Sequence, residues 1–248
     1  MKLTLAESRL LKESVGIISE LVSEANLRIA KDRIELIAMD PANVVMVVFK
    51  LLSSAFIEYN VEKEEVIAVN LDSLNQVLRR TKPNDTISLE LDEDSNKLKI
   101  VLAGDSHRTF NLRLISLDER EQKVPELNFN ANIETDSGIL ENAIEDVGII
   151  AESVAFFVDK DKFQVKSEGN ISDAKVELKK DENVEIRLDG SKAAAKYSVE
   201  YLKKIIKGGK LSDKVNIQFS NDYPLKVDYN VLNKLGLSFI LAPRVSNE

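Results

Sequence analysis

The sequence predicts an α+β protein built from two similar domains, and three observations lead to this prediction. First, segments in the first half of the 248-residue chain recur in the same order in the second half, at an offset of 127 to 129 residues. Second, each half mixes helical periodicity with short alternating strands. Third, a charged segment that contains a proline separates the two halves. Helices mixed with hairpin-connected strands are typical of α+β architecture rather than of a wound parallel sheet.

The internal repeat consists of four matched segments. They are KDRIEL at 31–36 with KDKFQV at 160–165, LNQVLRRTKPNDTISLEL at 74–91 with LKKIIKGGKLSDKVNIQF at 202–219, LKIVL at 98–102 with LKVDY at 225–229, and FNL at 110–112 with FIL at 239–241. Chance recurrence of common amphipathic patterns is the alternative explanation. The shared order and nearly constant offset favour a duplication. We therefore expect a first domain at 1–116, a connecting linker at 117–127 and a second domain at 128–248.

Each predicted domain begins with a strand and then a helix. In the first domain the helix is expected at Glu7–Val22, where apolar residues recur at helical spacing. Short alternating strands follow, and a second helix is expected at Leu71–Lys82. Three hairpin strands complete the domain, at Thr86–Leu91, Lys97–Leu102 and Thr109–Ile115. The segment SLDEREQKVPELN at 116–128 is charged and lacks apolar periodicity, which is typical of a linker.

The composition restricts the possible classes of function. Apolar residues make up 44% of the chain, yet no run of about 18 apolar residues is present, so no membrane-spanning helix is expected. The first residues, MKLTLAESRLLKES, carry charges inside their apolar stretch and do not resemble a secretory signal. Cysteine is absent, which excludes disulfide frameworks and cysteine-ligated metal sites. A reducing, cytoplasmic location is therefore expected.

Basic residues near the second helix of each repeat contrast with the net charge of −8, which by itself argues against a nucleic-acid partner. One face of the second helix carries Lys203, Lys207 and Lys210 at i, i+4 and i+7 spacing in the second repeat. The matching positions of the first repeat are the neutral Asn75 and the basic Arg79 and Lys82, and Arg80 and Lys204 lie beside them. A solvated helix face is one interpretation, since cations are favoured near a helix C-terminus. Because the pattern occurs twice in register, we favour weak, sequence-independent binding to a polyanion.

The first helix of each repeat fits this interpretation less well. Arg9 and Lys12 lie on the polar face of the first one, whereas their repeat partners are Gly138 and Glu141. Glu145 follows one turn later, so this face of the second domain is acidic. It is not expected to bind phosphate directly.

Catalytic signatures are sparse. The single histidine, His107, is expected in a turn and has no second histidine or cysteine with which to form a triad. KGGK at 207–210 lacks the strand context and the Ser or Thr of a phosphate-binding loop, and DEDS at 92–95 lacks the spacing of a calcium-binding hand. We therefore predict a non-enzyme with no cofactor and no metal site. A metal-dependent DNA-processing enzyme, with carboxylates that converge from separate elements, is the less favoured alternative.

Four short segments, taken in order, carry a family resemblance. They are MDPANVVMV at 39–47, VPEL at 124–127, YPLKVDY at 223–229 and LAPRV at 241–245. Together they make the whole chain resemble the DNA sliding clamps, in particular the archaeal proliferating cell nuclear antigen (PCNA) family. The resemblance implies the DNA clamp fold, in which two similar domains of antiparallel sheet contribute two helices each and the helices line the hole of a trimeric ring.

The resemblance also implies a role as a DNA polymerase processivity factor. Such a ring encircles duplex DNA without reading its bases, is loaded by replication factor C, and tethers DNA polymerase, flap endonuclease and DNA ligase in replication and repair. A homotrimer is expected, and a subunit of a heterotrimeric clamp is the alternative. The implied location is the nucleoid-associated cytoplasm of a prokaryotic-type cell.

Three surfaces are assigned residues by this resemblance. DNA-binding positions fall on Arg9, Lys12, Arg79, Arg80, Lys82, Lys203, Lys204, Lys207 and Lys210, whereas Glu13, Gln76, Asn142, Glu145 and Glu200 lack the positive charge of some relatives. The partner-peptide groove falls on Met39, Asn43, Val44, Met46, Val124, Pro125, Pro224, Ile240, Ala242, Pro243 and Val245. The subunit interface pairs edge strands at Thr109–Ile115 and Ala174–Lys180, with Arg108, Phe110, Arg113, Lys175, Val176 and Glu177. Asn43 stands where many relatives carry His, and Ile240 where eukaryotic ones carry Tyr, so the anchor that the groove prefers stays open.

Overall fold

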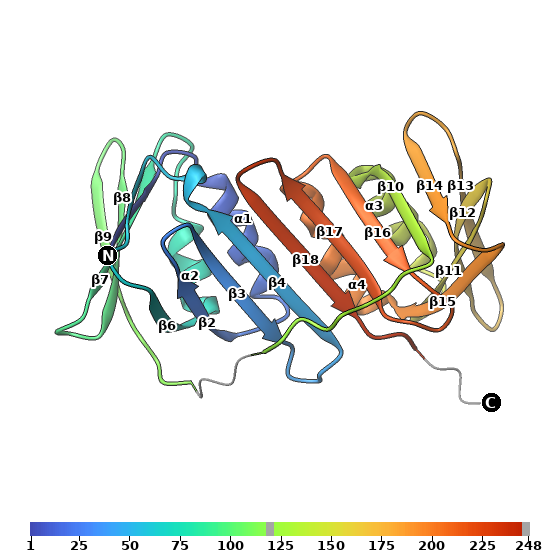
Figure 1. Cartoon of the computed structure of the whole chain (residues 1–248), viewed down its shortest axis with the longest axis horizontal. Helices are drawn as coiled ribbons and strands as arrows, with labels where there is room; N and C mark the ends of the chain where they lie inside the picture. Colours follow the sequence, from blue (N-terminus) through green and yellow to red (C-terminus); the bar gives the residue numbers. More distant parts are fainter. Residues whose placement is uncertain (118–121, 245–248) are drawn as a thin grey trace. The chain divides into compact units, whose positions relative to one another are not determined.

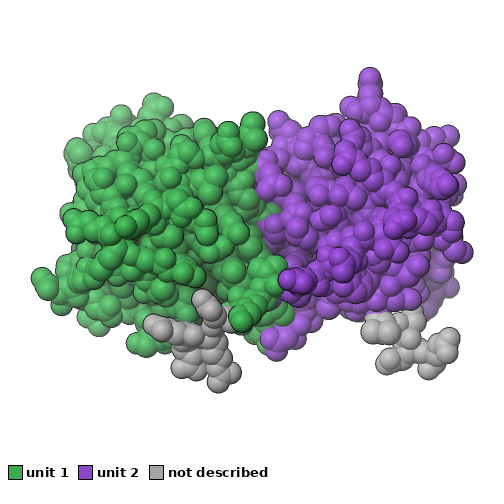
Figure 2. Space-filling view, viewed as in Figure 1, with its two compact units in different colours: residues 1–41, 47–124, 231–237 green, residues 42–46, 125–230, 238–248 purple. Residues whose placement is uncertain are grey.

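The computed structural model describes residues 1–117 and 122–244, which belong to two compact units. Unit 1 comprises residues 1–41, 47–124 and 231–237, and unit 2 comprises residues 42–46, 125–230 and 238–248 (Figure 2). Within its described residues, each unit combines antiparallel strands with two α-helices. The predicted α+β class is therefore confirmed.

Unit 1 contains an antiparallel sheet with the strand order β5-β1-β7-β8-β9. Its strands are β1 (Lys2–Leu5), β5 (Glu58–Asn60), β7 (Thr86–Asp92), β8 (Lys97–Ala103) and β9 (His107–Arg113). The register places Leu3 beside Leu89 and Ile100 beside Phe110. Leu3, Leu89 and Ile100 are buried, so this face of the sheet packs into the core.

A second group of strands in unit 1 supports the two helices. Strands β6 (Glu65–Asn70), β2 (Glu24–Ile29), β3 (Arg33–Met39) and β4 (Val45–Leu52) are neighbours in that order, and the 3₁₀ turn η1 (Ser53–Ala55) follows β4. Helices α1 (Arg9–Ile18) and α2 (Leu71–Leu78) lie behind these strands in Figure 1. In β3, Ile34, Leu36 and Ala38 alternate with less buried residues, as expected for a strand that covers helices with one face.

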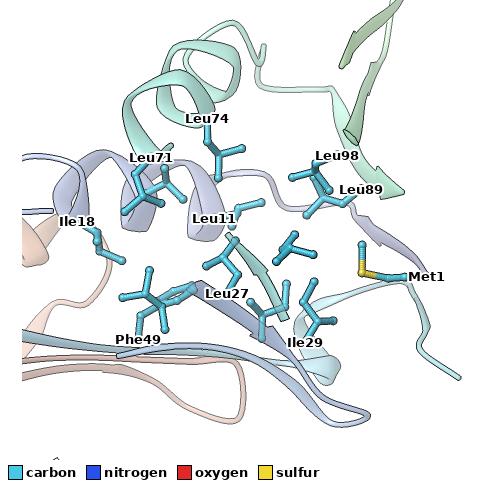
Figure 3. A pocket seen from close by; sticks show the side chains of 14 residues that line it. Met1, Leu11, Ile18, Leu27, Ile29, Phe49, Leu71, Leu74, Leu89 and Leu98 are labelled. Carbon is cyan, nitrogen blue, oxygen red and sulfur yellow. The ribbon is translucent and has the colours of Figure 1, made fainter. Parts of the chain in front are cut away.

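The core of unit 1 contains a small cavity of about 20 Å³ with an entirely apolar lining (Figure 3). Leu11 from α1, Leu74 from α2 and Phe49 from β4 contribute to the lining, and the side chain of Met1 lies at one end. A space of this size accommodates about one water molecule, but a water needs polar partners. The cavity is therefore expected to be dry.

Unit 2 repeats this combination of elements. One sheet has the order β13-β12-β11-β15, from strands β11 (Ser153–Asp159), β12 (Lys162–Glu168), β13 (Asp173–Lys179) and β15 (Lys192–Ser198). A second group places β14 (Val184–Leu188), β10 (Ala131–Asp136), β16 (Lys214–Phe219), β17 (Leu225–Val231) and β18 (Leu235–Leu241) side by side. The helices are α3 (Ser137–Val147) and α4 (Val199–Ile205), and the 3₁₀ helix η2 (Ile206–Lys210) continues α4.

Aromatic side chains fill the centre of unit 2. Phe156 makes edge-to-face contacts with Phe163, Tyr197 and Phe219 at ring-centroid distances of 5.2, 5.3 and 5.9 Å. All four rings are fully buried. Such pairs contribute about 0.5–1.5 kcal/mol each beyond the area they bury. These rings form one connected cluster within the core of unit 2.

Both predicted helices of unit 1 are shorter than expected. The helix predicted at Glu7–Val22 is α1, which ends at Ile18. It ends there because the hydroxyl of Ser19 donates to the carbonyl of Gly16 at 3.1 Å and the chain tightens into a turn. The helix predicted at Leu71–Lys82 ends at Leu78. There the amide of Thr81 bonds to the carbonyl three residues earlier, and a residue before proline disfavours helical geometry.

The last hairpin of unit 1 is shifted by two residues from its prediction. The strand expected at Thr109–Ile115 is β9, which begins at His107, so this histidine lies in a strand and not in a turn. At the other end, Ile115 forms only an isolated bridge with Ala68. The other strand predicted for the subunit interface, expected at Ala174–Lys180 in unit 2, is β13 and begins one residue earlier.

Candidate nucleic-acid and partner interfaces

The basic residues of the first repeat lie at the end of α2 and beyond it, rather than along the helix. Arg79 is the C-cap residue, and Arg80 and Lys82 belong to the turn that follows. All three are exposed. The predicted helical stripe is therefore a helix end followed by a turn, and we call residues 79–85 basic turn 1.

Basic turn 1 is fastened to the β8–β9 hairpin. Asp85, whose side chain is 2% exposed, accepts a hydrogen bond from the Lys82 amide at 2.6 Å and forms an ion pair with Arg108. Arg108 also donates from Nη1 to the Arg80 carbonyl at 2.8 Å, and the Lys82 ammonium lies 3.6 Å from Asp105. The Lys82 amide, and then the Arg108 guanidinium, lower the pKa of Asp85 despite its burial. Arg108, expected at a subunit interface, thus has partners within its own unit.

The basic residues of the second repeat divide between α4 and η2. Helix α4 carries Lys203 and Lys204, and η2 carries Lys207 and Lys210. We call η2 basic turn 2. The Lys204 ammonium lies 3.1 Å from the carboxylate of Glu200, one helical turn earlier. Exposed pairs of this kind contribute little to stability.

A pair of contacts between helices, which sequence reasoning missed, occupies equivalent positions in the two repeats. In unit 1, Asn75 Nδ2 donates to Ser19 Oγ at 3.0 Å. In unit 2, Lys203 Nζ donates to the carbonyl of Gly148 at 3.4 Å. Ser19 and Gly148 are the C-cap residues of α1 and α3, and the repeat offsets pair them with each other. A side chain of the second helix in each unit is therefore hydrogen-bonded to the C-cap residue of the first helix. The polar residues at the aligned positions 75 and 203 are the feature of the sequence that could have predicted these contacts.

The first helices differ in charge as the sequence predicts. On α1, the Arg9 Nε lies 3.7 Å from the carboxylate of Glu7, and Lys12 is half-buried. On α3, Glu145 is exposed and Glu141 is half-buried. Whether either helix contacts phosphate stays a prediction.

The C-terminal tail lies against its own unit through main-chain hydrogen bonds. The Ala242 amide donates to the Val44 carbonyl at 2.9 Å, and the Arg244 amide donates to the Lys196 carbonyl of β15 at 2.7 Å. Between them Pro243 is half-buried, whereas Ala242 and Arg244 are exposed. Two of the predicted groove segments of unit 2, at Val44 and at the tail, are thus brought together.

The other predicted groove residues differ in exposure. Met46 and Ile240 are each 8% exposed, so they belong mostly to the core. Asn43 is exposed and has a φ of 56°, a left-handed conformation that Asn tolerates. Met39 and Pro224 are half-buried, and Val124 and Pro125 are exposed. Val245 lies outside the described residues.

Strands β9 and β13, which carry the predicted subunit interface, each stand at the end of a sheet order. Neither strand has a buried residue. Phe110, Val176 and Glu177 are half-buried, and Arg113 and Lys175 are exposed. Each strand therefore has one edge without a strand partner among the residues that the structure describes.

Over residues 1–117 and 122–244, no group of three or more His, Asp or Glu side chains is placed to hold a metal ion. In the same ranges, no helix has the length and apolar character needed to cross a membrane.

Two family models match consecutive parts of the chain. The model described as proliferating cell nuclear antigen, N-terminal domain, matches residues 1–122, and the model of the C-terminal domain matches residues 123–245. The chain belongs to the proliferating cell nuclear antigen family. These matches confirm the family that the sequence predicted from four short segments in a fixed order.

Sliding clamps from two archaea illustrate how similar this PCNA-family chain is to its relatives. The DNA polymerase sliding clamp of Nanoarchaeum equitans is 36% identical over 98% of this chain and 99% of the relative. That of Pyrococcus furiosus is 34% identical over 92% of this chain and 91% of the relative. The crystal structure of PCNA from Thermococcus kodakaraensis superimposes with a TM-score of 0.92 at 29% identity and covers 98% of this chain and 99% of that one. The PCNA fold, with two domains of antiparallel sheet, is confirmed by this match.

Proposed function

We propose that this chain, a non-catalytic DNA polymerase sliding clamp of the PCNA family, is a subunit of a ring that encircles duplex DNA. The observation that carries the proposal is the recurrence of basic residues at the same repeat positions, in basic turns 1 and 2, within a chain of net charge −8. Lys and Arg neutralise phosphates without reading bases. Weak contacts of this kind suit a ring, because topology retains the DNA while the contacts permit sliding. The division into domains 1–116 and 128–248, joined by 117–127, is part of the proposal.

A double charge reversal tests the DNA contact. Lys203→Glu with Lys207→Glu should weaken binding to a duplex at low salt and reduce the slope of log K against log salt by roughly 2, one for each lost phosphate contact. The matched control reverses two exposed lysines at strand ends, Lys160→Glu with Lys192→Glu, and should keep the slope. Equal slopes for the two double variants would refute the proposed DNA face.

Assembly is proposed to join β9 of one subunit to β13 of the next, which would cover both free edges. The resemblance to sliding clamps implies three subunits in the closed ring, so we expect a homotrimer of about 83 kDa from the 27.8 kDa chain. Light scattering over a dilution series measures this mass. A monomer at every concentration would contradict the homotrimer and favour a subunit that assembles with different chains.

Partner enzymes are proposed to dock at the C-terminal tail. The proposed clients are DNA polymerase, flap endonuclease, DNA ligase and the replication factor C loader, which carry a short motif with a Gln and apolar or aromatic anchors. An extended peptide can add main-chain hydrogen bonds beside a tail that is itself held by such bonds at Ala242 and Arg244. Removing residues 242–248 should abolish binding of such a peptide while leaving the urea midpoint of the chain nearly unchanged. Retained peptide binding would place the groove elsewhere.

A further inference from the structure

The proposed function leaves one buried charged group unused. Asp85 is among the few charged residues in the buried part of the described chain, and its carboxylate has two donors, the Lys82 amide at 2.6 Å and the Arg108 guanidinium. A buried carboxylate is costly unless it is paired and hydrogen-bonded. The two donors that Asp85 binds therefore indicate its structural role.

The surroundings of Asp85 are shaped to admit its carboxylate. A Cβ added at Gly104, in the β8–β9 turn, would overlap Asp85 Oδ1 and would meet the Asn84 carbonyl at 3.6 Å. Gly104 has an ordinary backbone conformation, so the close approach of the carboxylate, and not left-handed geometry, favours glycine there. The hairpin thus contacts basic turn 1 from two sides, through Arg108 on β9 and through the turn at Gly104.

The second repeat lacks this arrangement. Asp213 stands where Asp85 stands in the first repeat, but it is exposed. Leu237 occupies the position that matches Arg108, and it is fully buried. The acidic residue is therefore present in both repeats, whereas the ion pair is formed only in unit 1. This difference provides a matched internal control.

We propose that the Asp85–Arg108 ion pair is a positioning device that holds basic turn 1 against the β9 edge and so presents Arg79, Arg80 and Lys82 to DNA. The pair holds the turn at two points of its main chain, because Asp85 accepts from the Lys82 amide and Arg108 donates to the Arg80 carbonyl at 2.8 Å. The inference rests on the proposed function, since it assigns the DNA contact of that function to an ordered turn. Nothing in it requires Asp85 or Arg108 to touch DNA.

Because Arg108 lies on β9, the ion pair connects basic turn 1 to the proposed subunit interface. Strand β9 is the edge proposed to pair with a neighbouring subunit, and Arg108 belongs to it. Ordering β9 by assembly would then order basic turn 1 through the ion pair. The two events should be coupled in both directions, because linkage is reciprocal.

The test uses the full chain with Asp85→Asn, and the control is Asp213→Asn. Both substitutions remove one negative charge, so electrostatics alone predicts slightly tighter DNA binding for each. The positioning device predicts the opposite sign for Asp85→Asn only. At low salt, the affinity of Asp85→Asn for a DNA duplex of about 30 base pairs should fall about threefold or more. The slope of its log K against log salt should become smaller by roughly 1 or more. Fluorescence anisotropy over a salt series measures both quantities.

A second readout is independent of DNA. Hydrogen exchange of the Lys82 amide should become about tenfold faster or more in Asp85→Asn, because a charge-assisted hydrogen bond is replaced by a weaker one. Arg108→Lys keeps the positive charge but cannot form both contacts, so it should be intermediate for exchange and for DNA affinity. This milder variant also serves if Asp85→Asn fails to fold.

The outcomes separate the inference from the proposed function. Unchanged Lys82 exchange in Asp85→Asn and Arg108→Lys overturns the inference, and so does faster exchange with unchanged or tighter DNA binding. A variant with Arg79, Arg80 and Lys82 all changed to Gln tests the DNA face itself. If that variant binds DNA as tightly as the wild type, basic turn 1 is not a DNA contact and the proposed function fails at this surface. In that case, hydrogen exchange of the Lys82 amide in Asp85→Asn and Arg108→Lys still tests whether the ion pair orders the turn.

Discussion

Gly208 in basic turn 2 provides a sharp test of how that turn is held. A Cβ added at this position would overlap Cδ2 and Cε2 of the Tyr229 ring and would lie 2.8 Å from its Cγ. The ring cannot move away easily, because Tyr229 is fully buried and packs edge-to-face against Phe239 with centroids 6.4 Å apart. Overpacking of this kind costs about 1–3 kcal/mol. We therefore expect Gly208→Ala to lower the free energy of unfolding by that amount.

The internal repeat indicates a substitution at Tyr229 that should compensate for Gly208→Ala. Arg80 stands where Gly208 stands, and Leu102 stands where Tyr229 stands, so a side chain is accommodated in unit 1 beside a smaller partner. Tyr229→Leu alone should destabilise by about 2 kcal/mol through the lost ring volume. Combined with Gly208→Ala it should cost less than the sum of the two, with a coupling of about 1–2 kcal/mol.

Urea unfolding of the wild type, the two single variants and the double variant measures this coupling. The control is Gly138→Ala on α3, where an added Cβ meets no atom within 4 Å. Because alanine is the better helix former, this control should be neutral or stabilising by up to about 1 kcal/mol. Additive effects of Gly208→Ala and Tyr229→Leu would refute the reasoning, since they would show that the ring is not what excludes a side chain.

Three further predictions follow from single contacts. The Tyr229 hydroxyl is buried and has no hydrogen-bond partner among the described residues, so Tyr229→Phe should stabilise the chain by up to about 1 kcal/mol in urea unfolding, and a clear loss would reveal an unseen partner. Because the Lys82 amide and Arg108 lower the pKa of Asp85 in the folded state, its stabilising contribution is complete above the ordinary carboxyl pKa of about 4 and is lost as the pH falls through the lower folded value. The gap in melting temperature between the wild type and Asp85→Asn should therefore narrow below about pH 4, and a gap that stays constant from pH 7 to pH 3 would contradict this assignment. Val15→Ile adds one methylene beside the apolar cavity and should stabilise by up to about 0.8 kcal/mol in urea unfolding, whereas a loss would show that the cavity cannot accept it.

The sequence was sufficient to predict elements that depend on local patterns. In the helix predicted at Leu71–Lys82, Leu74, Val77 and Leu78 recur at helical spacing, and these residues form part of the buried face of α2. The end of that helix was not predicted, because the tightening at Thr81 competes with favourable helix propensity and is decided by the contacts of the following turn. Element boundaries are sensitive to such local competition.

Side-chain partners distant in sequence were beyond this reasoning. The family resemblance assigns Arg108 to a subunit interface, and nothing in the sequence indicates that it also pairs with Asp85, 23 residues earlier in the chain. Periodicity shows which face of an element is apolar, but it does not show which polar groups meet across two elements. The tie between Asn75 and Ser19 was missed for the same reason, although its counterpart in the second repeat aligns with it.

The positive charges of the two basic turns either have a function or only stabilise the C-terminal ends of helices, and their positions help to separate these explanations. A helix dipole attracts cations within the last turn of the helix and loses its effect beyond it. Lys82 lies four residues after α2 ends, where the dipole no longer explains a cation. Lys210 lies in the last turn of η2, which continues α4, so only the first repeat separates the two explanations. The two turns are also held differently, one by an ion pair whose carboxylate is buried and the other by a glycine against a buried ring. Different contacts that maintain the same charge spacing are expected if the position of the charges, and not the local packing, is what both repeats share.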